Sequence, residues 1–394
     1  MSSIATLLQA AEYIEWYERG MSKEWQDLPD ELILKILSYS EVEDLISCGQ
    51  VSKRTRNISQ DSSLWVTVNL EKKIAKTELL ELILRKGCKI LNISDSSIVG
   101  CLGSNIKSQL RVLTLSQSAW GFPVRDGPVY DIQGRCMIMP VYYKENIAVL
   151  EELLFSCCSL EHLKIVGLHI TPKMAVSICK NGKTLQELIL KSSFVEDRSI
   201  VGRTYPHSGQ EIVYSWFPHF QEIIKCCQKL IEVDIDYTTN GDGQGLWQED
   251  LEFLVKNITT KIEKINLWNH SFDDDHVKIL LSRCNKIKAL SLDTYSITDN
   301  SLTYIRKYLY LTLQELSFVD HHPGCHHLSL MVDGTQRPPK QRFSFTSFLE
   351  LKSMQKLEKI NLYNNKDDDV EIQNLRQHLP HIKISGDISY PFDL

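Results

Sequence analysis

Most of the chain repeats one short pattern of apolar and polar positions. From residue 88 to the C-terminus, the pattern apolar-x-x-apolar-x-apolar recurs in the segments CKILNIS (88), LRVLTLS (110), LEHLKIV (160), LQELILK (185), LIEVDID (230), IEKINLW (262), IKALSLD (287), LQELSFV (313), LEKINLY (357) and LPHIKIS (379). These segments begin 22 to 50 residues apart. The shorter intervals fit a repeat of about 20–29 residues, and the longer ones indicate a repeat that carries an insertion.

Each repeat predicts a strand followed by a helix. The last two apolar positions of a segment alternate with their neighbours, which is typical of a strand with one buried face. Helical spacing follows, as in HVKILLSRC (276–284), where Val277, Leu280 and Leu281 share a face. Neither element can bury its apolar face alone, so the repeats predict an α/β solenoid over residues 69–394. We expect a curved, ten-strand parallel sheet with helices on its convex side.

Three insertions interrupt this array, at residues 119–145, 196–216 and 320–345. Each lies after a strand and before the next helix, so all three are expected on one edge of the solenoid. Each also has extended arms around a turn-prone centre, which predicts a hairpin. Loops on one rim of a rigid scaffold often carry binding, and insertions without a role are the alternative.

The repeats resemble leucine-rich repeats of the cysteine-containing type. In that type a Cys ends the helix, and an Ile-Thr/Ser-Asp turn follows the strand. Here Cys157, Cys227 and Cys284 each lie three residues before the next strand's first apolar position, and residues 297–299 (Ile-Thr-Asp) reproduce the turn. Free Cys is among the most buried residue types, so we interpret these thiols as packing residues.

Residues 22–68 have a different pattern, that of a small helical module. Pro29, Asp30 and Glu31 suit the start of a helix, because the missing N–H costs nothing there and acids favour the helix dipole. Two apolar stripes follow, and the segment closes on Leu64-Trp65. A unit this small cannot bury all of its apolar side chains, so we expect a partner to cover the remaining apolar surface.

This module resembles an F-box over essentially its whole length. The matching segments are Leu28-Pro29-x-Glu31, Ile36-Leu37-Ser38-Tyr39, Glu43-Asp44-Leu45, Val51-x-Lys53-Arg54 and Ser63-Leu64-Trp65. It departs from the family at Thr55, where an aromatic residue is usual, and at Ser40 and Val42, which replace a frequent Leu and Pro. The resemblance implies a three-helix module that docks on a Skp-family adaptor. The adaptor-binding residues that it implies are Leu28, Pro29, Glu31, Ile33, Ile36, Leu37, Leu45, Val51, Leu64 and Trp65.

F-box proteins with leucine-rich repeats are, as a family, substrate receptors of SCF ubiquitin ligases, and the Skp2-like group has the most similar architecture. The resemblance implies that the adaptor leads to cullin and RING subunits while the repeats hold a protein target. Such a receptor works by proximity and needs no catalytic residue, metal or cofactor. The sequence contains no GxSxG, P-loop, HExxH or Rossmann glycine motif, so an enzyme is the remote alternative.

A target site on the concave surface follows from strand geometry. If the apolar positions of a strand face the core, their neighbours face the other way, toward the inner, concave surface of the solenoid. These inward positions include Asp234, Asp236, Asn266, Trp268, Ser291 and Asp293, with Asn361 and Tyr363 further along. Three acids around a Trp would suit a Lys/Arg-bearing or amine-bearing target segment, by charge pairing and cation–π contact. A solvated polar sheet face is the alternative.

Residues 1–21 predict an amphipathic helix. Its stripe consists of Ile4, Leu7, Leu8, Ala10, Ala11 and Ile14. The stripe resembles the helix by which Mad/Mnt-type repressors dock in a paired-amphipathic-helix corepressor. A structural helix that leads into the F-box is the favoured interpretation. The corepressor interpretation would fit a second function for the whole chain, a repeat scaffold that forms no ligase.

Composition limits the partners further. The 394 residues carry a net charge of -6 with a pI near 6.1, which argues against general binding to nucleic acid or an anionic membrane. No signal peptide and no apolar run of about 18 residues occurs. Eleven irregularly spaced cysteines without a CxxC pair fit reduced thiols, so we expect a cytoplasmic or nuclear protein.

Three clusters suggest metal ligands. The cluster at 321–327 (HHPGCHH) crowds its ligands around a Pro-Gly turn, which favours a polar hairpin base over zinc. The acidic runs at 273–275 and 367–369 lie at strand-to-helix turns, where carboxylates cap helices. We therefore predict no metal.

Overall fold

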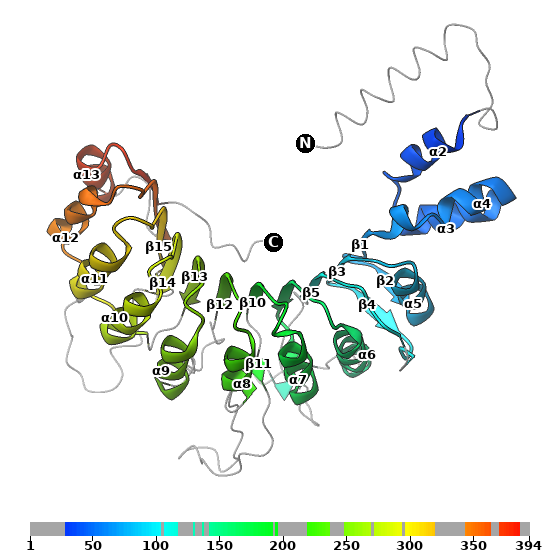
Figure 1. Cartoon of the computed structure of the whole chain (residues 1–394), viewed down its shortest axis with the longest axis horizontal. Coiled ribbons are helices and arrows are strands. Elements are labelled where there is room, and N and C mark those ends of the chain that lie inside the picture. Colours follow the sequence, from blue (N-terminus) through cyan, green and yellow to red (C-terminus); the bar gives the residue numbers. More distant parts are fainter. Residues whose placement is uncertain are drawn as a thin grey trace, which may run out of the picture.

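The chain forms an arch in which strands line the inner side and helices cover the outer side (Figure 1). A computed structural model describes residues 28–103, 106–116, 129–130, 136–137, 142–191, 194–195, 219–236, 248–268, 272–293, 296–319, 343–363 and 370–386. A small group of helices stands at the N-terminal end of the arch, and α13 (Val370–His378) lies at the other end. The α/β solenoid predicted from the repeats is confirmed.

The N-terminal helices pack around a small apolar centre. They are α2 (Asp30–Leu37), α3 (Val42–Val51), α4 (Lys53–Ser59) and the 3-10 turn η2 (Ser62–Trp65). Asp30 and Glu31 occupy the first turn of α2, as the sequence predicts. Ile33, one turn before Leu37, is fully buried with it, and Trp65 Nε1 donates a hydrogen bond of 2.8 Å to the Ser59 carbonyl.

One parallel sheet runs through the whole arch. Its strands, in spatial order, are β1 (Thr67–Asn69), β3 (Ile90–Ser94), β5 (Val112–Ser116), β8 (His162–Val166), β10 (Glu187–Lys191), β12 (Glu232–Asp236), β13 (Lys264–Trp268), β14 (Ala289–Asp293), β15 (Glu315–Val319), β16 (Lys359–Tyr363) and β17 (Lys383–Ser385). The prediction of ten strands is wrong, because the structure describes eleven strands in this sheet. The additional strand is β1, where Trp65, Val68 and Leu70 continue the apolar spacing one repeat before residue 88 and are all buried. Val68 pairs with Leu91 of β3.

Helices follow the strands on the convex side. They are α5 (Thr77–Arg85), α6 (Tyr142–Ser156), α7 (Pro172–Asn181), α8 (His219–Cys226), α9 (Gln248–Asn257), α10 (Asp274–Arg283), α11 (Asp299–Leu309), α12 (Phe345–Glu350) with η4 (Leu351–Ser353), and α13. Among the helices that the structure describes, none is both long and apolar enough to cross a bilayer.

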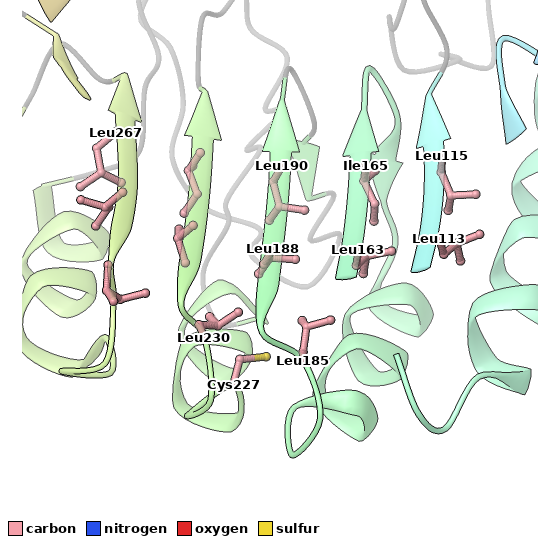
Figure 2. Packing of buried hydrophobic residues seen from close by; sticks show 14 of the residues in the cluster. Leu113, Leu115, Leu163, Ile165, Leu185, Leu188, Leu190, Cys227, Leu230 and Leu267 are labelled. Atoms are coloured by element: carbon pink, nitrogen blue, oxygen red, sulfur yellow. The ribbon is translucent and has the colours of Figure 1, made fainter. Parts of the chain in front are cut away.

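The core lies between the sheet and the helices. Leu188 and Leu190 alternate with partly buried neighbours along β10 and point toward the helices, as do the equivalent residues of the flanking strands (Figure 2). Cys227 lies beneath them, beside Leu230. Cys157, Cys227 and Cys284 are all fully buried, as the repeat phase predicts.

Side-chain caps start the helices after the predicted turns. Thr171 accepts a hydrogen bond from the Met174 amide, Asp273 from the His276 amide, and Thr298 from the Asn300 amide. The prediction that Asp273 acts as a helix cap is therefore confirmed.

Short strand pairs lie beside the main sheet. They are β2 (Ile74–Lys76) with β4 (Ser97–Val99) and β9 (His169–Ile170) with β11 (Phe194–Val195), both parallel, and β6 (Val129–Tyr130) with β7 (Cys136–Met137), which is antiparallel. The pair β6–β7 belongs to the insertion at 119–145. The predicted hairpins at 196–216 and 320–345, the helix at 1–21, the cluster at 321–327 and the acidic run at 367–369 lie outside the described residues, save for residues 343–345.

Candidate functional site

Two surfaces of the described chain carry the residues singled out from the sequence: the N-terminal helical module and the concave face of the sheet. Burial divides the ten residues predicted to bind an adaptor. Ile33, Leu37, Leu45, Leu64 and Trp65 are buried within the module, and Leu28 is partly buried against it. These side chains hold the helices together and are not available for contact. The exposed members of the set are Pro29, Glu31, Ile36 and Val51.

The outer face of α2 is apolar and uncovered. Leu32 is 38% exposed, Ile36 41% and Tyr39 53%, and their spacing of four and three residues places them along one side of the helix. Val51, at the end of α3, is 77% exposed. Large apolar side chains at this exposure within so small a module indicate a docking surface. Leu32 and Tyr39 were not among the residues predicted to bind an adaptor, although the helical period of the stripe includes them.

Two residues of the third helix order this module, and the sequence analysis assigned neither a role. Arg54 Nε donates a hydrogen bond of 2.7 Å to Asp30 Oδ1, and its Nη2 donates to the Leu28 carbonyl, so α4 holds the start of α2 in place. Thr55, which departs from the usual aromatic residue, is buried and forms a reciprocal capping box with Ser52. Thr55 therefore helps to cap the start of α4, at a position where F-box sequences usually have an aromatic residue.

The helical module is fixed to the solenoid by an ion cluster. Lys73, between β1 and β2, has its Nζ 2.5 Å from Glu41 Oε2 and 2.6 Å from Glu43 Oε2. The hydrogen bonds to Glu41 and Glu43 raise the pKa of Lys73 above its usual value. Burial opposes ionisation of Glu43, but the hydrogen bond from Lys73 leaves its pKa below the usual value. Lys86 Nζ also donates to the Gln60 carbonyl at 3.1 Å.

On the concave face, strand register brings several of the predicted target-binding residues together. Asp234 pairs with Asn266 across β12 and β13, and Asn266 with Ser291 across β13 and β14. Asp293 follows Ser291 on the same face of β14 but is only 1% exposed. The backbones of Asp236, Trp268 and Tyr363 form the ends of β12, β13 and β16, and their side chains lie outside the described set.

A hollow of about 250 Å³ opens over the middle of this face. The residues that line it are Lys191, Glu232, Val233, Asp234, Lys264, Ile265, Asn266, Ala289, Leu290, Ser291, Glu315 and Ser317. Its charged side chains form ion pairs, with Lys191 Nζ 2.9 Å from Asp234 Oδ2 and Lys264 Nζ 3.0 Å from Glu232 Oε2. Neither lysine is among the residues predicted from the sequence, although alternation with the buried Leu190 and Ile265 places both on the concave face.

Asp234 is the most enclosed acid of this hollow that the structure describes in full. Burial raises the pKa of its carboxyl above the usual value, and this effect outweighs the charge of Lys191 and the hydrogen bonds from Lys191 and Asn266. The expectation that Asp234 presents a fully available charge therefore needs revision, since Lys191 already pairs with one of its oxygens.

Comparison with known proteins assigns the first surface. Residues 25–71 match the F-box-like family. The whole chain is similar to a chain in the crystal structure of the Rad7 and Elc1 complex in yeast, with 12% sequence identity, a TM-score of 0.38, and coverage of 99% of this chain and 96% of that chain.

The fold and the matched segment together define the class of protein. An F-box-like module at the N-terminal end is followed directly by an α/β solenoid of strand–helix repeats, and the two share one continuous apolar core.

Proposed function

We propose that this chain is the substrate-recognition subunit of an SCF-type E3 ubiquitin ligase, in the manner of the Skp2-like receptors. The observation that carries the proposal is the F-box-like segment at residues 25–71 with its uncovered apolar face on α2. This face would dock on a Skp-family adaptor, which would bring cullin and RING subunits. The solenoid would hold a protein target, and the chain itself would catalyse nothing, acting by raising the local concentration of the target.

The joint between the two parts supports this role. Lys73 pairs with Glu41 and Glu43 across the boundary, and Trp65 of the module and Val68 of β1 are both buried, so the helical module packs directly against the solenoid. A receptor that works by proximity needs a joint of this kind, since the target must reach the charged ubiquitin carrier.

The test is complex formation between the full chain and a purified Skp-family adaptor. The variant should replace exposed side chains only, so Leu32, Ile36 and Val51 are changed together to Ala, and the buried Ile33 is left intact. We expect the wild-type chain to form a 1:1 complex and the triple variant to lose at least about 100-fold in affinity, at roughly fivefold or more for each of the three side chains truncated.

The matched control is Val176→Ala on α7, which removes a side chain of similar exposure (55%) far from the module. It should bind the adaptor as the wild type does. Absence of a wild-type complex would refute the ligase role and favour the scaffold alternative, whose helix at residues 1–21 could then be tested against a paired-amphipathic-helix domain.

A further inference from the structure

One inward row of side chains crosses the middle of the solenoid. Backbone register makes Asp234, Asn266, Ser291, Ser317 and Asn361 successive neighbours on β12 to β16. Adjacent strands lie about 4.8 Å apart, so these polar groups form a ladder along the concave face. The hollow of about 250 Å³ opens over the first four of them.

The hydrogen-bond donors of this ladder are already engaged. Lys191 Nζ and the Asn266 side chain both donate to Asp234, and Asn361 Nδ2 donates to Glu315 Oε1 at 2.6 Å and to Ser317 Oγ at 2.9 Å. Three acceptors remain. Asp234 Oδ1, Asn266 Oδ1 and Asn361 Oδ1 are buried and have no hydrogen-bond partner among the described residues. A ligand that satisfies this row must therefore supply donors.

The charge of the hollow points in the same direction. Its lining contains three acids, Glu232, Asp234 and Glu315, against two lysines, Lys191 and Lys264. Each lysine is paired with one acid of the lining, and the third acid, Glu315, pairs at 2.9 Å with Lys359, which lies outside the hollow. An anionic ligand would therefore find each of these lysines already paired and would face the unsatisfied oxygens.

We propose that this hollow binds a cationic side chain, lysine or arginine, of the protein target, with its N–H groups donating to Asp234 Oδ1 and Asn266 Oδ1. The inference rests on the proposed receptor function, which supplies a protein as the ligand. A protonated nitrogen group provides both the donors and the charge, whereas a neutral amide provides donors alone.

The experiment uses the purified full chain and a displayed library of random peptides. Selected peptides are synthesised, and their affinities are measured. We expect the selected sequences to share a basic residue at one position. Exchange of that residue for its neutral counterpart, citrulline for arginine or acetyl-lysine for lysine, should lower affinity at least tenfold. Because this change is made in the peptide, its effect does not depend on how a protein variant folds.

The protein variant is Asp234→Asn, which removes the charge at nearly constant shape, and it should also lower affinity at least tenfold. The matched control is Thr114→Ala, which alters the equivalent inward position on β5, three strands away along the sheet. It should bind as the wild type does. A selection that yields no peptide, or peptides without a shared basic residue, or affinities that the neutral counterpart leaves unchanged, would overturn the inference.

The same preparations separate this inference from the receptor role. Adaptor binding is measured in parallel and uses the F-box surface, not the ladder. A chain that binds the adaptor but selects no basic residue retains its proposed function and loses this inference. A chain that selects basic peptides but binds no adaptor retains the peptide site and loses the proposed ligase role.

Discussion

Lys73 Nζ lies 2.6 Å from Glu43 Oε2, which pairs a cation of the first repeat with a carboxylate in the first turn of α3. The pair spans the boundary between the F-box-like module and the solenoid. It acts together with the shared apolar core, in which Trp65 of the module and Val68 of β1 are both buried. The joint is therefore both apolar and electrostatic.

A double-mutant cycle with Lys73→Met and Glu43→Gln measures the electrostatic part. The pair is partly exposed, so we expect a coupling free energy of roughly 0.2–1 kcal/mol at pH 7. The pKa of Glu43 is lowered from 4.5 and that of Lys73 is raised from 10.5. The coupling should therefore be lost as pH falls through the folded-state pKa of Glu43, and also as pH rises through that of Lys73. Urea unfolding of the four proteins at pH 7 and pH 3 checks this, and equal coupling at both pH values would contradict it.

Asp274 links two consecutive repeats through its carboxylate. It accepts hydrogen bonds from the Thr298 amide at 2.9 Å, the Thr298 hydroxyl at 2.6 Å and the Ser301 hydroxyl at 2.5 Å. Asp274→Ala leaves the buried Ser301 hydroxyl without this acceptor, while the exposed Thr298 donors turn to water, so we expect the unfolding free energy to fall by roughly 1–3 kcal/mol. Asp275→Ala is the matched control, because Asp275 is exposed, and it should change stability by no more than about 0.5 kcal/mol.

The contribution of Asp274 also has a defined pH dependence. Burial opposes ionisation, but the hydrogen bonds from Ser301 and Thr298 hold the pKa of its carboxyl below the usual value of 3.8. A lowered pKa means that the stabilisation is fully present above pH 3.8 and declines as pH falls through the folded-state pKa. Thermal melts between pH 2 and pH 6 should show the gap between wild type and Asp274→Ala narrowing only at the acidic end. A gap that is constant over this range would contradict the ionised carboxylate as its source.

Ile33 and Ile36 test the division of the F-box-like module into core and surface. Ile33 is fully buried, so Ile33→Ala should cost roughly 2–5 kcal/mol in unfolding free energy. Ile36 is 41% exposed, so Ile36→Ala should cost less than about 1 kcal/mol while weakening adaptor binding. Chemical denaturation combined with adaptor titration separates the two effects. If Ile36→Ala destabilised the chain as much as Ile33→Ala, the assignment of Ile36 to the surface would be wrong.

Some features of the structure could be predicted from the sequence alone. The repeat pattern located the strands of the solenoid after β1, because every strand there carries the same alternation and buries the same positions, as Leu188 and Leu190 do. The helix starts at Asp273 and Thr298 followed from local capping chemistry. Such features depend on neighbours within a few residues, so they can be predicted from one sequence.

Features that depend on distant partners could not be predicted in this way. Ile33 and Ile36 belong to one apolar stripe, and only the packing of α3 and α4 decides which of them is covered. Asp234 appeared as an available charge because Lys191 lies far away in the chain, across the insertion at 196–216. Register between β10 and β12 brings the pair together.

The neighbouring cysteines at 157–158 and at 226–227 provide the last prediction. Burial raises the pKa of Cys157 to about 11 and that of Cys227 to about 12, whereas Cys158 and Cys226 are exposed. Only the thiolate reacts with iodoacetamide. At pH 8 about a thousandth of a thiol of pKa 11 is in the thiolate form, and burial also keeps the reagent away from it. Mass spectrometry of the folded chain should find Cys158 and Cys226 alkylated and their buried neighbours unmodified. All four should react in urea. Equal labelling within either pair in the folded chain would mean that the buried member is not a packing residue, and the phase of the repeats at that helix would have to be reassigned.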